Sequence, residues 1–194
     1  MNNTKQYYQD NAHVFFDSTV NADMSAHYEH LLKFVPAHGR ILDFGCGSGR
    51  DTKAFLQKGY VVEAIDGSSE MCKLASEYCG IQVKCMDFND LSVVKKYDAI
   101  WACASLLHIS KEQMPNILMK MRDALVGGGA IYISYKYGDY EGEINGRYFT
   151  YVTPEVFSEI LSYVDGLNII EEWFTEDTRL ENNTRWYNII LKKE

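Results

Sequence analysis

The fold is decided by the stretch ILDFGCGSGRDT (residues 41–52), in which an apolar run ends in an acid and a glycine-rich turn. Glycine has no Cβ, so a glycine-rich backbone can approach a ligand closely. A helical pattern follows the turn, and the stretch therefore predicts a strand, a turn and a helix in succession. In open α/β sheets, ligands bind beyond the carboxyl ends of such strands. The turn is the predicted site of a nucleotide-type ligand.

The kind of nucleotide follows from the residues around the glycines. A dinucleotide-binding turn reads G-x-G-x-x-G/A, but here Arg50 stands in the sixth position and Gly49 comes one place early. A P-loop is excluded because no Gly-Lys-Ser/Thr follows. The carboxylate of Asp43 would repel phosphates. It would suit a cation, such as the sulfonium and ammonium groups of S-adenosylmethionine.

Two further acids stand where neighbouring strands are expected to end. Asp66 lies 21 residues after Gly45, where a carboxylate can bind both ribose hydroxyls, although NAD enzymes share this feature. Asp87 and Phe88 follow the next strand, where an acid and an aromatic residue can bind an adenine amino group and flank its ring. Three acids at successive strand ends, one of them before the glycines, form a specific constellation.

Strands and helices alternate along most of the chain. Apolar runs predict strands at 40–44, 61–65, 82–86, 97–103 and 130–136, and amphipathic stretches predict helices within the first forty residues and at 51–58, 69–78 and 111–125, with a short segment at 90–95. A helix at 154–164 and an antiparallel pair at 167–174 and 185–192 are expected to complete the chain. This alternation predicts βαβ units and a mostly parallel sheet covered on both faces.

Composition narrows the class of protein. The chain has 194 residues, 46% of them hydrophobic and 24% charged, which is typical of one globular domain. We expect a cytoplasmic protein without a membrane partner, because no apolar run approaches the ~18 residues of a membrane span and no signal sequence is evident. Five irregularly spaced cysteines without a C-x-x-C pair predict reduced thiols and no metal site. The net charge of -8 disfavours a nucleic acid partner.

On these residues, the chain resembles class I S-adenosylmethionine-dependent methyltransferases, and it is most similar to the small bacterial tellurite-resistance-like methyltransferases. The likeness rests on residues 41–52, DGSSEM (66–71), MDF (86–88), YDAIWACASLLHI (97–109) and GGGAIYISYKYG (127–138). It implies a doubly wound, Rossmann-like α/β fold with a seven-stranded, mostly parallel sheet and one antiparallel strand near the C-terminus. The implied cofactor is S-adenosylmethionine.

The resemblance also implies the cofactor-binding residues, which are Asp43, Gly45, Cys46, Gly47, Asp66, Gly67, Met71, Asp87, Phe88 and Cys103. The glycine turn would abut the methionine part. Asp43, directly or through water, and the carbonyl of Cys103 would meet its ammonium group. Asp66 would bind the ribose, and Asp87, Phe88 and Met71 would surround the adenine. Met71 is equally consistent with a core position, and Cys46 with a small apolar residue.

The acceptor side of the site is less marked in the sequence. We divide the single domain 1–194 into an N-terminal helical lid (1–37), a cofactor-binding core (38–136), a substrate-side loop (137–152) and a C-terminal helix with antiparallel strands (153–194). Candidate substrate residues are Tyr8, Phe15, Arg50, Tyr135 and Arg147. The two arginines could together clamp an anion. Alternatively, each could be solvated or pair with a local acid, for which Asp51, Asp139, Glu141 and Glu143 are nearby.

His108 is the candidate catalytic residue, because an imidazole can take a proton at neutral pH. The alternative is a residue that orients the loop or caps the next helix. Methyl transfer from a sulfonium is an in-line displacement with a good leaving group, so alignment can supply much of the rate without a base.

The predicted function is methyl transfer to a small-molecule acceptor. The sequence lacks the Asn/Asp-Pro-Pro-aromatic signature of nucleic acid amino methylation and the Pro-Cys nucleophile of pyrimidine C5 methylation. Three alternatives stay open: an RNA or protein methyltransferase that works with a partner, a non-catalytic S-adenosylmethionine-binding protein, and an NAD-binding oxidoreductase. The sequence is compatible with a monomer or a homodimer.

Overall fold

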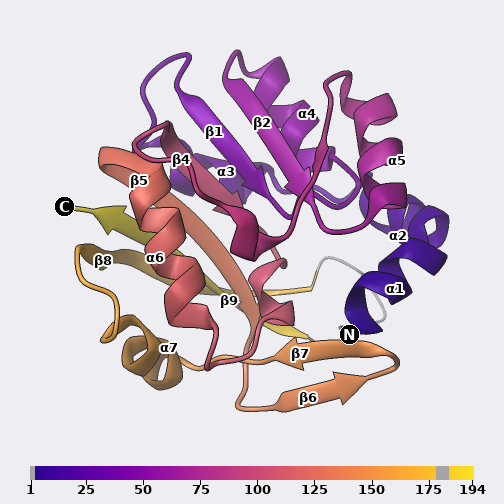
Figure 1. The fold of residues 1–194 in the computed structure, drawn as a ribbon. Helices are drawn as coiled ribbons and strands as arrows, with labels where there is room; N and C mark the ends of the chain where they lie inside the picture. The colour runs from indigo at the N-terminus through magenta and orange to yellow at the C-terminus, as the bar shows by residue number, and fades with distance from the viewer. Residues whose placement is uncertain (1–2, 178–183) are drawn as a thin grey trace.

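The computed structural model describes residues 3–177 and 184–194. The carboxyl ends of its central sheet point toward the helices of the predicted N-terminal lid (Figure 1). The seven strands of this sheet lie in the order β3-β2-β1-β4-β5-β9-β8. Their bounds are β1 Arg40–Phe44, β2 Val61–Asp66, β3 Lys84–Cys85, β4 Tyr97–Ala102, β5 Leu125–Lys136, β8 Leu167–Glu176 and β9 Arg185–Lys193. Only β9 runs antiparallel to its neighbours β5 and β8. The predicted seven-stranded sheet with one antiparallel strand is confirmed.

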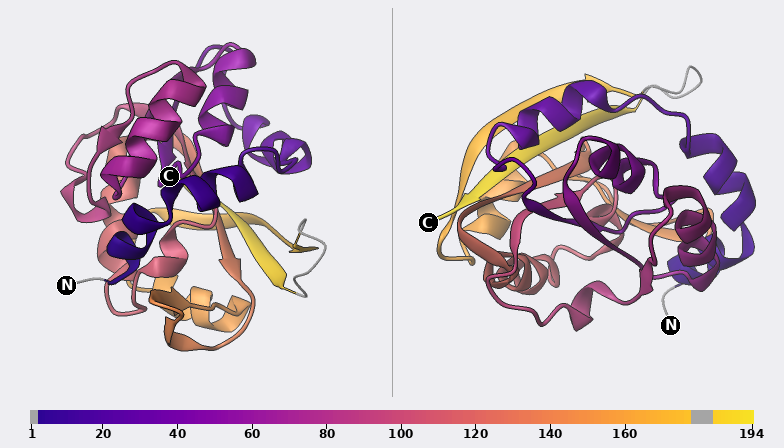
Figure 2. Two further views of the ribbon diagram at one scale, coloured as in Figure 1. Left: turned by 90° about the vertical axis from the view of Figure 1, so that its right-hand side faces the viewer. Right: turned by 90° about the horizontal axis from the view of Figure 1, so that it is seen from above.

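Helices cover both faces of the sheet (Figure 2). They are α1 Asn3–Asp10, α2 Ala12–Thr19, α3 Ser25–Leu32, α4 Arg50–Gln57, α5 Ser69–Cys79, α6 Met114–Ala124 and α7 Pro154–Leu161, with short 3₁₀ turns at Phe88–Asp90 and Leu106–His108. Among the described residues, no helix has both the length and the apolar character that crossing a membrane requires.

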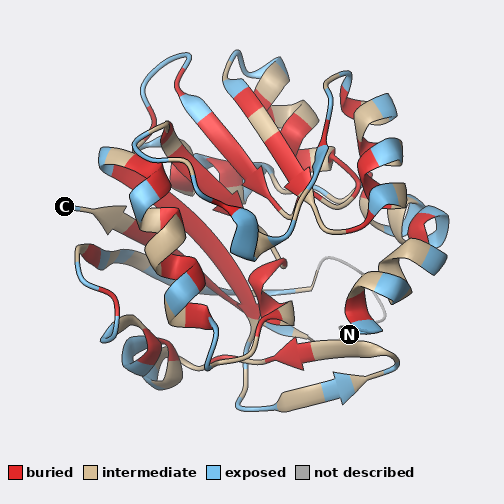
Figure 3. Cartoon of the chain, viewed as in Figure 1, coloured by how far each residue is buried: buried red, intermediate tan, exposed pale blue. Residues whose placement is uncertain are grey.

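Side-chain alternation along the strands divides the core into clusters on opposite faces. Trp101 and Tyr132 pack with α3 and α4, whereas Ile100, Ile131 and Ile133 pack with α6 and α7. The central strands are buried almost throughout (Figure 3). A parallel sheet covered by helices on both faces requires this pattern, because neither face meets water.

Several element bounds differ from the sequence prediction. The strand expected at 82–86 is only two residues long in β3, and the short segment expected at 90–95 is replaced by the 3₁₀ turn at Phe88–Asp90. Helix α6 begins three residues later than expected, at Met114, with a proline in its first turn. Proline is favoured there because its missing N–H is not needed by the first turn of a helix.

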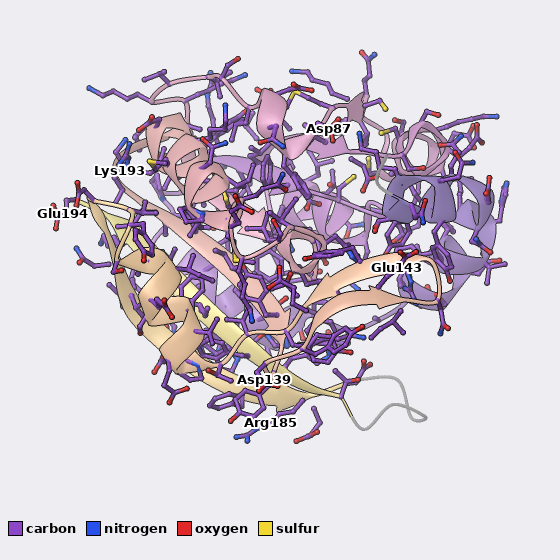
Figure 4. The ribbon with its side chains drawn as sticks, turned by 60° about the horizontal axis from the view of Figure 1, so that its bottom comes forward. Asp87, Asp139, Glu143, Arg185, Lys193 and Glu194 are labelled. Carbon is purple, nitrogen blue, oxygen red and sulfur yellow. The ribbon has the colours of Figure 1, made fainter. Side chains whose placement is uncertain are left out.

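The expected substrate-side loop forms a β-hairpin of its own. Strands β6 (Glu141–Ile144) and β7 (Arg147–Thr150) pair antiparallel outside the main sheet. The hairpin lies below the carboxyl ends of the central strands, next to α1 (Figure 1). Figure 4 looks onto this hairpin, with Glu143 labelled, whose Oε1 accepts a hydrogen bond from Asn3 of α1 at 3.0 Å. Lid and hairpin therefore meet over one end of the sheet.

Candidate active site

A cavity of about 470 Å³ lies where the glycine turn, helices α1 and α2, and the β6–β7 hairpin meet. A volume of several hundred Å³ is typical of small-molecule and cofactor sites. The structure brings most of the predicted site residues to its wall, namely Tyr8, Phe15, Gly45, Cys46, Gly47, Arg50, Asp66, Gly67, Met71, Asp87, Phe88, Cys103, His108 and Arg147. Asp43 and Tyr135 do not line it.

The glycine turn is shaped by close contacts that exclude a side chain. Gly45 has a φ of +87°, and a Cβ built there would lie 2.5 Å from the Cβ of Ser105. Ser105 is itself fixed, because its hydroxyl donates to the carbonyl of Phe44 at 2.7 Å. A Cβ at Gly47 would lie 3.4 Å from the ring of Phe15, so helix α2 also reaches this turn. The turn leaves bare backbone facing the cavity.

Asp66 is held at the end of β2 by backbone donors. Its Oδ2 accepts from the amide of Gly47 at 3.0 Å, and its Oδ1 accepts from the amide of Ser68 at 2.9 Å. Each carboxylate oxygen has two lone pairs, so both retain acceptor capacity toward the cavity that Asp66 lines. The position suits a ligand with two neighbouring hydroxyls.

Asp43 does not line the cavity, so only a water-mediated interaction with the ligand ammonium group stays a prediction. Its carboxyl is 1% exposed and accepts a 2.6 Å hydrogen bond from the hydroxyl of Thr52 on α4. Asp43 thus lies beneath the turn and ties the end of β1 to the following helix. Burial, followed by the negative charge of Asp51, raises the pKa of Asp43 to about 8.

Replacing Asp43 with asparagine is therefore expected to change how stability depends on pH. A carboxyl whose pKa is raised by folding contributes full stability below its ordinary pKa, and this contribution is lost as the pH rises toward about 8. Relative to the wild type, Asp43→Asn should therefore gain unfolding free energy steadily as the pH rises from about 5 toward 8. Urea unfolding at three pH values tests this. Parallel pH curves for the two proteins would contradict it.

Tyr135 is a wrong prediction, because strand alternation turns it away from the cavity. It is 0% exposed, and its hydroxyl donates to the sulfur of Met114 at 3.2 Å in the core beneath α6. The alternate residues Tyr132, Ser134 and Lys136 point to the other face and line the cavity. The even-numbered residues of this part of β5, and not the odd-numbered ones, therefore face the cavity.

Arg50 lies on the cavity wall, but its guanidinium is bound by the neighbouring acid. Its Nε and one terminal nitrogen donate to the two oxygens of Asp51 at 2.7 and 2.8 Å. Asp51 also accepts from the hydroxyl of Tyr28 at 2.6 Å and from the indole of Trp101 at 2.8 Å. The geometry therefore supports a local ion pair of Arg50 with Asp51. It does not support an anion clamp formed by Arg50 and Arg147.

His108 lies against Tyr8 of helix α1, and its hydrogen bonds define its tautomer. Its Nδ1 lies 2.7 Å from the carbonyl oxygen of Tyr148, which can only accept, so Nδ1 carries the proton. Its Nε2, 2.9 Å from the hydroxyl of Tyr8, then accepts from that hydroxyl. Burial lowers the pKa of His108 to about 4, against the opposing effect of the Tyr148 carbonyl. The imidazole is neutral at physiological pH.

Two side chains of helix α1 fasten it over the cavity. Lys5 forms an ion pair with Asp87 at the end of β3, and its side chain passes over Gly67. Gln9 accepts from the hydroxyls of Ser68 and Ser69 at the start of α5, each at 3.1 Å. The first helix thus covers the side of the cavity where Asp66 and Asp87 lie.

Sequence reasoning missed many of the residues that line the cavity, among them Lys5, Asp51, Ser105 and Lys136. Ser105 and Lys136 follow or end strands β4 and β5, so the signal that identified the acids, polar residues at carboxyl strand ends, could have found them. Lys5 carried no local signal, because its place depends on how α1 docks.

The chain is similar to known methyltransferases. A family described as a methyltransferase domain matches residues 41–129. An uncharacterised methyltransferase of Staphylococcus carnosus is 28% identical, with 91% of this chain and 94% of the relative aligned. An uncharacterised methyltransferase of Bacillus cytotoxicus is 31% identical over 56% of this chain, and the aligned part spans 53% of that relative's length.

Solved structures share the fold at low sequence identity. An S-adenosylmethionine-dependent methyltransferase of Methanosarcina mazei superimposes with a TM-score of 0.76 at 19% identity, covering 89% of this chain and 99% of that one. The 1,6-didemethyltoxoflavin-N1-methyltransferase of Burkholderia thailandensis, solved with 1,6-didemethyltoxoflavin and S-adenosylhomocysteine, has a TM-score of 0.76 at 20% identity, covering 97% and 84%.

Proposed function

We propose that the chain, which has the fold of S-adenosylmethionine-dependent methyltransferases, is such an enzyme and methylates a small-molecule acceptor. The observation that carries the proposal is that the lid and the hairpin together line and partly cover one cavity. Such a cover leaves room for a compact acceptor beside the cofactor and obstructs a polymer chain. The Burkholderia enzyme, with the same fold, was solved with a small heterocycle.

The residues present fit the cofactor. We assign the bare backbone of the turn from Gly45 to Gly47 to the methionine part, and the two carboxylate oxygens of Asp66 to the ribose hydroxyls. Asp87 and Met71 would flank the adenine, with Lys5 closing over them. S-adenosylmethionine, when bound, supplies the electrophilic methyl group. The protein's own contribution is to orient the acceptor and exclude water.

Asp43, Cys46, Gly67, Phe88 and Cys103 complete the assigned set. Asp43 acts from beneath the turn, through Thr52 and the start of α4. We keep the carbonyl of Cys103 as the acceptor for the cofactor ammonium. The similarity to the tellurite-resistance-like group stays a prediction, since the relatives named above do not carry that description.

We assign His108 to holding Tyr8 over the acceptor, because a neutral imidazole whose lone pair is already bound by a hydroxyl is a poor base. His108→Ala is expected to lower kcat by less than about tenfold, the loss of one positioning contact. Its affinity for S-adenosylhomocysteine should be unchanged. The wild-type kcat should show no inflection near pH 6.5. A collapse of kcat in this variant at unchanged cofactor affinity would instead identify His108 as the base.

The function itself is tested by transfer of a radiolabelled methyl group. The full chain is incubated with labelled S-adenosylmethionine and a panel of thiols, carboxylates, amines, chalcogen oxyanions and tRNA. We expect label in a small molecule. Label in tRNA or in a co-purifying protein would favour an RNA or protein methyltransferase with a partner. Cofactor binding without any turnover would favour a non-catalytic binding protein. Light scattering then separates a monomer from a homodimer.

A further inference from the structure

The end of the cavity formed by the hairpin carries two cations on one aromatic ring. Lys136, at the end of β5, has its Nζ 4.4 Å from the ring centre of Phe149. Arg147, on β7, has its Cζ 5.0 Å from the same ring. All three residues line the cavity. Positive charge is therefore concentrated on the wall that closes the proposed acceptor side.

Arg147 holds a polar atom that the described residues leave unsatisfied. Its Nε is buried without a hydrogen-bond partner among them. The guanidinium carbon lies 4.5 Å from the ring centre of Tyr7 and 5.0 Å from that of Phe149. Contacts with ring faces do not occupy the in-plane N–H groups that bind carboxylates and other oxyanions. Buried donors are nearly always paired in folded proteins, so the unpartnered Nε points to a missing partner, a ligand or an ordered water, for a guanidinium that lines the cavity beside Tyr8.

The acids on the cavity wall lie on other elements. Asp66 and Asp87 stand at the ends of β2 and β3, and Asp51 is bound by Arg50. Glu176 and Asp177 lie at and beyond the end of β8, where Asp177 accepts from the indole of Trp186 at 3.3 Å. The hairpin itself presents no carboxylate among the residues that line the cavity, within the part of the chain that the structure describes.

The hydrogen-bonded pair of Tyr8 and His108, beside Arg147, is consistent with an acceptor that needs no deprotonation. The hydroxyl of Tyr8 donates to His108, whose pKa is lowered by burial and further by the charges of Arg147 and Lys136. This end of the cavity therefore offers positive charge and a weak base. An acceptor that arrives already ionised matches both features.

We propose that Arg147, assisted by Lys136, binds the oxyanion of a small acidic acceptor at the hairpin end of the cavity. The proposal rests on the proposed function and narrows its substrate class to anions. The shared chemistry is an oxyanion, which can belong to an organic carboxylate or to an inorganic chalcogen oxyanion. Phe149 and Tyr8 supply flat apolar surface beside it, which favours the organic source.

The experiment compares matched acids and amides on the full chain saturated with S-adenosylhomocysteine. Benzoate with benzamide and phenylacetate with phenylacetamide are tested by thermal shift and as acceptors in the radiolabel assay with S-adenosylmethionine. Selenite forms the inorganic arm. We expect a response to the acids, or to selenite if the source is inorganic, and none to the amides. An equal response to acids and amides, or no response to any anion, would overturn the proposal.

Variants separate charge recognition from general damage. Arg147→Met should weaken the response to the anion at least tenfold, Lys136→Met by a smaller factor, and Arg147→Lys should restore part of it. Arg40→Met, at the exposed start of β1, is the matched control and should behave as wild type. Affinity for S-adenosylhomocysteine should stay within twofold throughout. Failure of the wild type to bind S-adenosylhomocysteine would refute the proposed function itself, whereas cofactor binding with labelling of neutral acceptors would refute only the anion subsite.

Discussion

Asp66→Ala is expected to weaken the binding of S-adenosylhomocysteine by at least about 100-fold, which corresponds to about 3 kcal/mol. Two hydrogen bonds from ribose hydroxyls to a carboxylate would be lost, and a bond to a charged group contributes about 1.5–3 kcal/mol. The alanine also releases the amides of Gly47 and Ser68, which Asp66 now holds at the mouth of the glycine turn. Isothermal titration calorimetry on the purified chain measures the effect directly.

Two companion variants make this result specific. Asp66→Asn keeps one acceptor oxygen and should retain part of the affinity. Asp90→Ala removes an exposed acid from the 3₁₀ turn beyond β3 and should bind as the wild type does. Thermal unfolding without ligand shows whether Asp66→Ala is still folded. An unchanged affinity in a folded Asp66→Ala protein would refute the ribose assignment.

The fold was predictable because its signals are local. Strand β1 begins and ends at the residues expected from the apolar run, and the order of strands and helices follows from the alternating periods of the sequence. The acids Asp66 and Asp87 were found because carboxyl ends of parallel strands meet at one edge of a sheet. Both indeed line the cavity. Patterns that span a few residues carry this information.

The errors concern which way a side chain faces. Asp43 and Asp51 both flank the glycine turn, and only the packing of α4 on the sheet turns Asp51 toward the cavity and Asp43 toward Thr52. Tyr135 could have been assigned correctly, since it shares its parity with the apolar residues Ile131 and Ile133 of the core. An even-odd analysis of β5 would have selected Lys136 instead.

The placement of the lid lay beyond local sequence signals. Lys5 reaches Asp87, which is 82 residues away in the chain. The amide of Tyr148 on the hairpin donates to the hydroxyl of Thr4 in α1. No periodicity or motif near the N-terminus encodes these partners, because they depend on how the hairpin and α5 are arranged. Closure of the cavity is a property of the tertiary structure.

Asp51→Ala is expected to destabilise the fold by about 3–5 kcal/mol, or to lower Tm by roughly 10 °C. The side chain of Asp51 is 7% exposed, and it binds the buried guanidinium of Arg50 as well as Tyr28 and Trp101. Despite burial, which raises it, the pKa of Asp51 is lowered by this pairing, so the carboxylate is charged at neutral pH. Removing it strands a cation beside the core, and that uncompensated charge is the main cost. Urea or thermal unfolding measures the loss.

The chain contains its own matched control for this prediction. Arg122 and Asp123 are also adjacent in sequence and paired, but the side chain of Asp123 is 53% exposed. Water can solvate Arg122 when its partner is removed, so Asp123→Ala should cost no more than about 1 kcal/mol. A double variant, Arg50→Met with Asp51→Ala, should recover part of the loss because no unpaired charge is left. If Asp51→Ala and Asp123→Ala were equally mild, burial of the pair would not be what holds α4 against the sheet, and the turn before it would need another support.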